Sequence, residues 1–126
     1  MAGKFIITRT KNGDYTFSLK AGNGEIILNA FETYTTLAAC ESGIASVKRN
    51  AQAAVEDQTR KESIEHPKYE LYMDKAGEYR FRLTVADGAS ISKSEGYKAK
   101  ASAKKGIASI GRNAPDAPVV AVDPET

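Results

Sequence analysis

The side chains best suited to covalent or acid–base chemistry in this 126-residue chain are its single cysteine, Cys40, and its single histidine, His66. A thiolate can act as a nucleophile or redox sensor, and an imidazole can relay protons or bind a metal. Cys40 falls on the expected apolar face of a helix, where a cysteine behaves as a small hydrophobic residue. His66 precedes a proline in a charged stretch and has no second histidine for a relay. We expect neither residue to be catalytic, and together they are too few for a Cys/His zinc site.

Two further motifs resemble parts of known active sites. Gly22-Asn23-Gly24 has the composition of a phosphate loop, but such a loop leads from a strand into a helix. Here strand patterns lie on both sides, so we interpret it as a hairpin turn. Ser46 and Ser109 lie inside expected helices without a neighbouring base or a nucleophile-elbow motif. We therefore predict that the protein is not an enzyme and has no catalytic residue, cofactor or metal.

A group of basic residues in the second half of the chain is a candidate binding surface. Its members are Arg80, Arg82, Lys98, Lys100, Lys104, Lys105 and Arg112. A basic helix beside strands that carry arginines is a layout that some DNA-binding domains use. Against this interpretation, the formal net charge is only +2, and six of the seven matching positions in the first half are not basic: Thr16, Ser18, Thr35, Leu37, Glu41 and Ser42. A lysine-rich helix face exposed to solvent is the structural alternative.

The composition is that of a globular protein, with 41% hydrophobic and 27% charged residues. That balance excludes an intrinsically disordered chain. Only three consecutive apolar residues, Phe5 to Ile7, occur near the start, which is too few for a secretory signal or a membrane span. We expect a cytoplasmic protein without membrane contact.

An internal duplication is the most informative feature of the sequence. With a shift of 64, residues 4–27 align with 68–91 and eight of 24 positions are identical. With a shift of 63, residues 32–51 align with 95–114 and ten of 20 are identical. Gly43-Ile44-Ala45-Ser46 matches Gly106-Ile107-Ala108-Ser109 within the second block. The chain therefore contains two copies of one structural unit.

Each copy shows a change from strand to helix periodicity. Tyr15, Phe17 and Leu19 alternate with polar residues, which predicts a half-buried strand. A strand precedes this one and a third follows, at 25–29 in the first copy and 89–92 in the second. Apolar and small residues then recur at helical spacing up to Asn50 and Asn113. Short closing strands are expected at 53–57 and 118–122.

Six residues are assigned structural roles. Gly13 and Gly77 are expected in hairpin turns, where Asn-Gly and similar pairs are favoured. Gly43 and Gly106 lie inside the helices, where glycine costs about 1 kcal/mol relative to alanine. We interpret them as sites of close approach, either of helix to sheet or of the two helices, with a ligand groove as the functional alternative. Asn50 and Asn113 are expected to close the helices in the left-handed conformation.

These patterns predict an α+β fold of two tandem β3-α-β repeats. The repeats comprise residues 1–57 and 68–122, joined by a connector at 58–67 and followed by a tail at 123–126. Because one helix over three strands gives a thin core, we expect the repeats to share one core across a pseudo-two-fold axis, as a monomer with an internal pseudo-dimer. A single antiparallel sheet with both helices on one face is the expected arrangement.

The duplicated residues also carry a resemblance to a known family. Gly13-x-Tyr15-x-Phe17-x-Leu19, then Tyr34, then Gly43-Ile44-x-Ser46-Val47-x-x-Asn50-Ala51, resembles the YegP-like family of small bacterial proteins of unknown function. The resemblance covers 4–57 and 68–122, as in a tandem two-domain member. It implies β3-α-β units in a single sheet with closing strands exchanged between units, and it brings no known activity. Gln52 departs from the pattern, because Pro115 occupies its place in the second copy.

Two functions therefore remain open on the sequence alone. The first is a non-enzymatic module that binds an unknown protein or small molecule. The second is weak nucleic-acid or anion binding through the basic second helix and the strand arginines.

Overall fold

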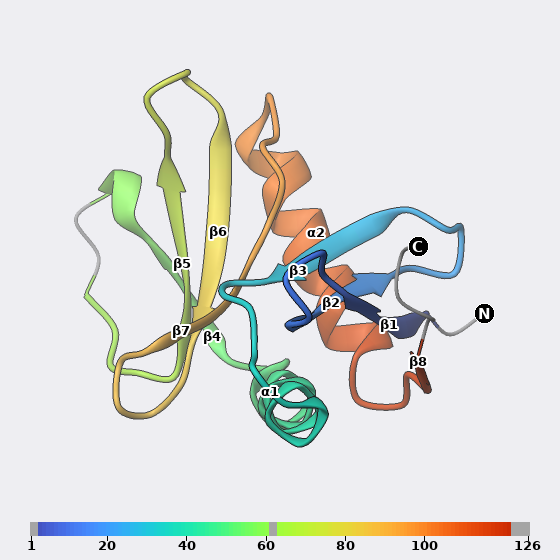
Figure 1. The fold of residues 1–126 in the computed structure, drawn as a ribbon. Helices are drawn as coiled ribbons and strands as arrows, with labels where there is room; N and C mark the ends of the chain where they lie inside the picture. Colours follow the sequence, from blue (N-terminus) through green and yellow to red (C-terminus); the bar gives the residue numbers. More distant parts are fainter. Residues whose placement is uncertain (1–2, 61–62, 122–126) are drawn as a thin grey trace.

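Each repeat begins with a hairpin in which aromatic and branched residues alternate with polar ones. The computed structural model describes residues 3–60 and 63–121 (Figure 1). The three first strands of each repeat are β1 (Lys4–Arg9), β2 (Tyr15–Lys20) and β3 (Ile26–Ala30), and β5 (Lys68–Met73), β6 (Tyr79–Thr84) and β7 (Ser90–Lys93). Gly13 and Gly77 have φ values of 87° and 84° in the first turns, which favour glycine. The predicted hairpins are confirmed, including the turn at Gly22-Asn23-Gly24.

The two helices begin differently, although both have 14 residues. They are α1 (Leu37–Asn50) and α2 (Lys100–Asn113). The Thr36 hydroxyl accepts a hydrogen bond from the Ala39 amide at 3.0 Å and caps α1. Ala99 takes the same place before α2 and has no side chain that can cap the helix.

The prediction that Asn50 and Asn113 close the helices in the left-handed conformation is wrong. Each is the last helical residue, and the following Ala51 and Ala114 also have right-handed helical angles. The amides of Asn50 and Asn113 donate to the Ser46 and Ser109 carbonyls, at 2.8 Å in both helices. The helix ends are closed without a left-handed residue: the Ala53 amide donates to the Asn50 carbonyl at 2.9 Å, and the Ala114 amide donates to the Ile110 carbonyl at 2.8 Å.

Eight strands form one sheet in the order β4-β5-β6-β7-β3-β2-β1-β8. The closing strands are β4 (Ala54–Asp57) and β8 (Val119–Ala121). β4 pairs with β5 and β8 pairs with β1, and both pairings are parallel. The expected all-antiparallel sheet is therefore wrong, because each closing strand follows a helix that crosses over the sheet before the chain pairs again.

One hydrophobic core contains residues of both repeats. Phe5, Phe17, Tyr69 and Phe81 point to the same side of the sheet and are at most 1% exposed. α1 packs on β2 and β7, and α2 packs on β3 and β6, so each helix contacts both repeats. Burial of each of these large side chains contributes on the order of 2 kcal/mol. The core therefore depends on both halves of the chain.

The remaining segments are short. Of the connector, Gln58–Arg60 forms one 3-10 turn, and residues 63–67 lead directly into β5. Val122, where the second repeat was expected to end, and the tail at 123–126 lie outside the described residues. Neither helix of the described chain is long and apolar enough to cross a membrane.

Candidate binding surfaces

The face of the sheet opposite α1 and α2, called here the open face, carries one row of directly paired residues across all eight strands. From edge to edge the row consists of Glu56, Glu70, Arg82, Lys93, Asn29, Ser18, Ile6 and Val120. Directly paired residues point to the same face of a sheet. The row therefore changes from charged residues in the second repeat to uncharged and apolar residues in the first.

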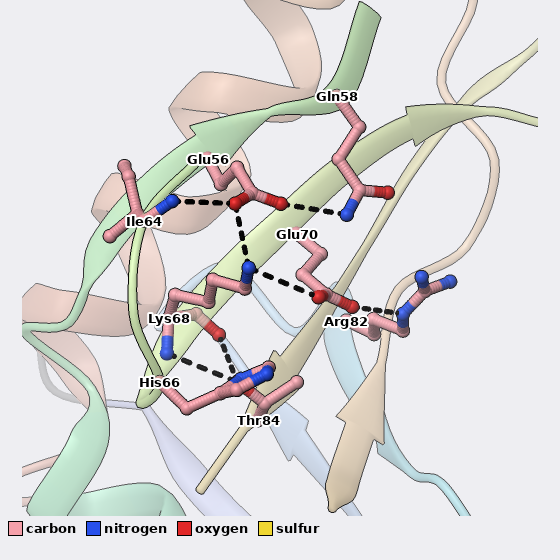
Figure 2. A network of polar contacts seen from close by, with 8 residues as sticks. All are labelled: Glu56, Gln58, Ile64, His66, Lys68, Glu70, Arg82 and Thr84. Atoms are coloured by element: carbon pink, nitrogen blue, oxygen red, sulfur yellow. Dashed lines mark hydrogen bonds and ion pairs between the residues drawn. The ribbon is translucent and has the colours of Figure 1, made fainter. Parts of the chain in front are cut away.

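The charged end of the row is a buried network of alternating charges (Figure 2). Lys68 Nζ lies 2.6 Å from Glu56 Oε2 and 3.5 Å from Glu70 Oε2, and Arg82 Nε lies 2.5 Å from Glu70 Oε1. Glu56 and Glu70 are only 4% and 9% exposed. Two acids and two bases balance one another, as buried charges require.

The connector covers this network and helps to fix it. The Ile64 amide donates to Glu56 at 2.7 Å, and the Gln58 amide donates to the other oxygen of the same carboxylate at 2.7 Å. Hydrogen bonds from Lys68 and Gln58 hold the pKa of Glu56 at about 2, well below its usual range. His66 Nδ1 lies 2.7 Å from Thr84 Oγ1 in the same area. The network therefore holds the connector against the sheet and is structural.

The two candidate strand arginines lie on the open face and have acidic partners. Arg80 Nε is 2.6 Å from Asp74 Oδ2, and Arg82 pairs with Glu70. The Arg82 guanidinium also lies 4.6 Å from the centre of the Tyr72 ring, a favourable cation–π distance. Both charges are thus partly neutralised within the protein.

The candidate basic residues of α2 lie on the other side of the sheet. Lys100 Nζ is 2.9 Å from Asp57 Oδ2 and 2.6 Å from Thr59 Oγ1. Lys104, Lys105 and Arg112 are exposed along the helix. Lys98 precedes the helix. The structure therefore does not bring the arginines and the helix together into one basic surface.

A groove of about 570 Å³ lies between the second half of α2 and the turn from α1 to β4. Its floor and walls are formed by Ala51, Gln52, Ala53, Val55, Ile107, Ala108 and Gly111, with Lys104 and Arg112 beside them. Gln52 Nε2 donates to the Gly111 carbonyl at 2.5 Å and joins the two walls. Lys104, Ala108 and Arg112 are spaced by four residues, so they share one face of the helix.

The sequence pattern indicated Lys104 and Arg112 but not the rest of the groove. Gly111 is glycine where the first repeat has Lys48, and Gln52 is the point at which the repeats diverge. These two differences between the repeats were the only features of the sequence that indicated a groove. The network residues Glu56, Lys68 and Glu70 gave none, because alternating polar residues are typical of any exposed strand face.

Gly43 and Gly106 make room for tyrosines rather than for a ligand. A Cβ atom at Gly106 would lie 2.7 Å from the Tyr97 hydroxyl oxygen, and one at Gly43 would collide with the Tyr34 hydroxyl. These rings stack on Phe81 and Phe17 with centroid distances of 6.1 and 6.2 Å. Close approach of helix and sheet is thus confirmed, and a ring from the same repeat occupies the place of the suggested groove.

Two other chemically suggestive residues, Cys40 and Ser109, are buried or hydrogen-bonded within the fold. Cys40 is fully buried, and burial raises the pKa of its thiol to about 11. The Ser109 hydroxyl accepts a hydrogen bond from the Asn113 amide at 3.0 Å. In residues 3–60 and 63–121 there is no group of three or more histidine, cysteine or acidic residues that could hold a metal ion.

Two copies of one β3-α-β unit that build a single mixed sheet define a class of small tandem-repeat proteins. Residues 10–57 and 74–120 both match the family described as a domain of unknown function, DUF1508. A UPF0339 protein of Bordetella pertussis is 39% identical over 118 residues, which is 94% of each chain. The UPF0339 protein YegP of Yersinia pestis is 40% identical over 88% of each chain. This chain therefore belongs to the UPF0339 family of YegP-like proteins and carries two copies of the domain.

Solved structures of similar proteins have the same fold. The solution structure of YegP from Escherichia coli, a protein of unknown function, superposes with a TM-score of 0.81 at 32% identity. It covers 100% of this chain and 97% of its own. A UPF0339 protein of Shewanella oneidensis gives a TM-score of 0.79 at 28% identity, over 98% and 93% of the chains. The resemblance inferred from the repeated motifs is confirmed.

Proposed function

We propose that the protein is a non-enzymatic binding module that takes an anionic segment of a partner in the groove beside α2. The observation that carries this proposal is the position of Lys104 and Arg112, two exposed cations beside a groove with a largely apolar lining. They are eight residues apart, or roughly 12 Å along the helix. An extended peptide with acidic residues four positions apart spans a similar length, about 13 Å.

The first repeat supports the specificity of this groove. Glu41 stands where α2 has Lys104, and Lys48 stands where α2 has Gly111. A lysine at the latter position would project from the helix where the glycine leaves room. In the second repeat, two basic residues therefore flank a groove that no side chain at position 111 fills. The first repeat has an acid at position 41 and a long side chain at position 48, so it lacks this combination.

The test is a titration of the full chain with a capped peptide that has two glutamates four residues apart and a central leucine. We expect amide shifts at Gln52, Val55 and Ala108 in NMR spectra. Lys104→Glu should weaken binding roughly tenfold, because reversing one rim charge costs about 1.4 kcal/mol. Lys105→Glu is the matched control, since Lys105 is exposed but does not line the groove. Equal effects of the two substitutions, or no shifts in the groove, would contradict the proposal.

Weak nucleic-acid binding is the second candidate, and the charge of α2 favours it. The segment from Lys98 to Arg112 has five basic residues and no acid. Counterion release predicts a steep dependence of affinity on salt. Titration with single-stranded RNA and duplex DNA at two salt concentrations tests this. Under this candidate Lys104→Glu and Lys105→Glu should flatten the salt slope equally.

The proposal also includes the symmetry of the molecule and its oligomeric state. Val55 lies opposite Tyr69 in the same register that places Val119 opposite Phe5. This supports an approximate two-fold axis relating the repeats, with β4 and β8 as exchanged closing strands. We propose that the chain works in the cytoplasm as a monomer whose two repeats act as an internal pseudo-dimer.

A further inference from the structure

A second groove, of about 460 Å³, lies between the last turn of α1 and the turn that joins β6 to β7. This volume is within the range of small-molecule sites, about 300–1,000 Å³. The helix lines the groove with the polar side chains of Ser46, Arg49 and Asn50, and the hairpin adds the Asp87 carboxylate and three aliphatic residues. No residue lines both this groove and the groove beside α2. The two grooves are therefore distinct candidate sites.

Arg49 and Asp87 bring opposite charges to this groove, and neither charge is neutralised within the protein. In the described part of the chain, neither side chain forms an ion pair, with the other or with a third residue. Each is held by a neutral partner instead. Arg49 Nη2 donates to Ser46 Oγ at 2.9 Å, and Asp87 Oδ1 accepts from the Ala89 amide at 2.9 Å. The other guanidinium donors and Asp87 Oδ2 are left for a ligand.

Asn50 contributes an acceptor that the second repeat uses and the first does not. The equivalent oxygen in α2, Asn113 Oδ1, accepts a hydrogen bond from the Gly3 backbone amide at 2.8 Å. Gly3 directly precedes β1, whereas Pro67 directly precedes β5 and has no N–H to donate. Asn50 Nδ2 donates to the Ser46 carbonyl, but among residues 3–60 and 63–121 no donor reaches Asn50 Oδ1. A ligand donor at this half-buried oxygen would satisfy it.

We propose that this groove binds a small zwitterion, an α-amino acid with an aliphatic side chain. Its ammonium group donates to Asn50 Oδ1 and faces Asp87, at a helix C-terminus that also favours positive charge. Its carboxylate pairs with Arg49, because a planar guanidinium matches the geometry of a carboxylate. Its side chain lies against the aliphatic part of the groove, which consists of Val85, Ala86 and Ile91.

The equivalent place in the second repeat lacks two of these features. Gly3 already uses the Asn113 oxygen, and Asn23 stands where the β6–β7 turn has Asp87. Asn23 Oδ1 accepts from the Glu25 amide at 3.0 Å, just as Asp87 Oδ1 accepts from the amide two residues on. Either residue therefore makes the same turn. The negative charge of Asp87 has no part in that turn, which supports its role in binding a cationic group.

The experiment titrates the ¹⁵N-labelled full chain with leucine. We expect shifts of the amides of Arg49, Asn50 and Asp87, with unchanged amides at Ala108 and Gly111 in the groove beside α2. N-acetylleucine lacks the ammonium group and leucine amide lacks the carboxylate. Each should bind roughly tenfold more weakly, because each loses a charged hydrogen-bonding group. Equal binding of leucine and leucine amide would overturn the proposal, since the site would then recognise the amino terminus of a peptide.

Two variants test the residues that carry the proposal. Asp87→Asn introduces the residue of the equivalent turn, so it removes the charge and keeps the turn, and Arg49→Ala removes the partner of the carboxylate. Both should weaken leucine binding roughly tenfold. Lys105→Ala is the control for the loss of one exposed positive charge, because Lys105 lines neither groove. The spectrum of each variant shows directly whether it remains folded.

The groove beside α1 and the groove beside α2 are tested by different ligands and different amides, so one can fail without the other. The proposal is overturned if millimolar leucine produces no shifts at the end of α1 and in the β6–β7 turn. It is also overturned if Lys105→Ala weakens binding as much as Arg49→Ala, since the effect would then be one of overall charge.

Discussion

At the scale of single residues, the close approach of a helical glycine to a tyrosine hydroxyl is repeated in both halves. Tyr34 and Tyr97 each form an isolated bridge to the strand residue Tyr15 or Tyr79, which fixes their backbone. Their rings stack on Phe17 and Phe81, which limits their movement. The glycine is therefore required by a ring that cannot easily move away.

We expect Gly106→Ala to destabilise the fold by about 1–3 kcal/mol, the usual cost of overpacking, despite the gain in helix propensity of about 1 kcal/mol. The added Cβ would lie 2.7 Å from the Tyr97 hydroxyl. Tyr97→Phe removes that oxygen, so the double variant should recover much of the loss in urea unfolding. Gly111→Ala is the control, because its Cβ would meet nothing closer than 3.4 Å. Additive effects of the two substitutions would show that the contact is not the cause.

The buried carboxylate of Glu56 predicts a dependence of stability on acid. Folding lowers the pKa of this carboxyl from its ordinary value of 4.5 to about 2, mainly through the hydrogen bond from Lys68. A lowered carboxyl pKa stabilises the folded state fully above the unfolded value, and this stabilisation is lost as pH falls from about 4.5 to about 2. We expect the urea midpoint to fall over this interval.

Glu56→Gln separates this residue from the other acids. The variant should be less stable at pH 7, because the buried Lys68 loses the nearer of its two carboxylate partners and keeps only Glu70, at 3.5 Å. Its stability should also fall less than that of the original chain between pH 4.5 and pH 2. Identical slopes for the two proteins would contradict the assignment of this pH dependence to Glu56.

At the scale of elements, the helices differ at the capping residue that precedes each of them. Thr36 caps α1, whereas Ala99 leaves α2 without a side-chain cap. Ala99→Thr should therefore stabilise the protein by about 0.5–1 kcal/mol, and Thr36→Ala should destabilise it by about 0.5–2 kcal/mol. Thermal unfolding of both variants measures the effects. A loss of stability in Ala99→Thr would mean that the α2 terminus is held by other contacts.

The elements themselves were predictable from local sequence, and their partners were not. Alternation at Tyr15, Phe17 and Leu19 and the turn at Gly13 depend on neighbours within a few residues, so they are visible in the chain. The pairing of β4 with β5 joins segments whose own sequences contain no trace of a partner. For the same reason, the hydrophobic pattern indicated the closing strands but not the strands with which they pair.

The candidate sites also combine features that are visible in the local sequence with features that depend on the fold. Lys104 and Arg112 were found because charge is a local property. The groove that they flank depends on the distance between α2 and the turn after α1, which only the fold determines. The connector's cover over Glu56 was hidden as well, because a charged segment before a proline is also what an exposed linker looks like.

At the scale of the whole molecule, each repeat lacks a complete sheet and core without the other. In an isolated first repeat, residues 1–60, β4 would have no β5 to pair with and β3 would lose β7. α1 would lose its contact with β7. We expect this fragment to be unfolded or to pair with itself, because a short sheet with one helix buries too little surface to offset its loss of conformational entropy.

Sedimentation and amide hydrogen exchange of the fragment, beside the full chain, distinguish these outcomes. In the full chain we expect amides of β2 and β6 to exchange with similar free energies, because both repeats contribute to one core and unfold together. A fragment that pairs with itself would show protected amides only as a dimer, with β4 of one copy beside β1 of the other. A well-folded monomer of residues 1–60 would contradict the dependence of each repeat on the other, and the core would then be two separable units that happen to touch.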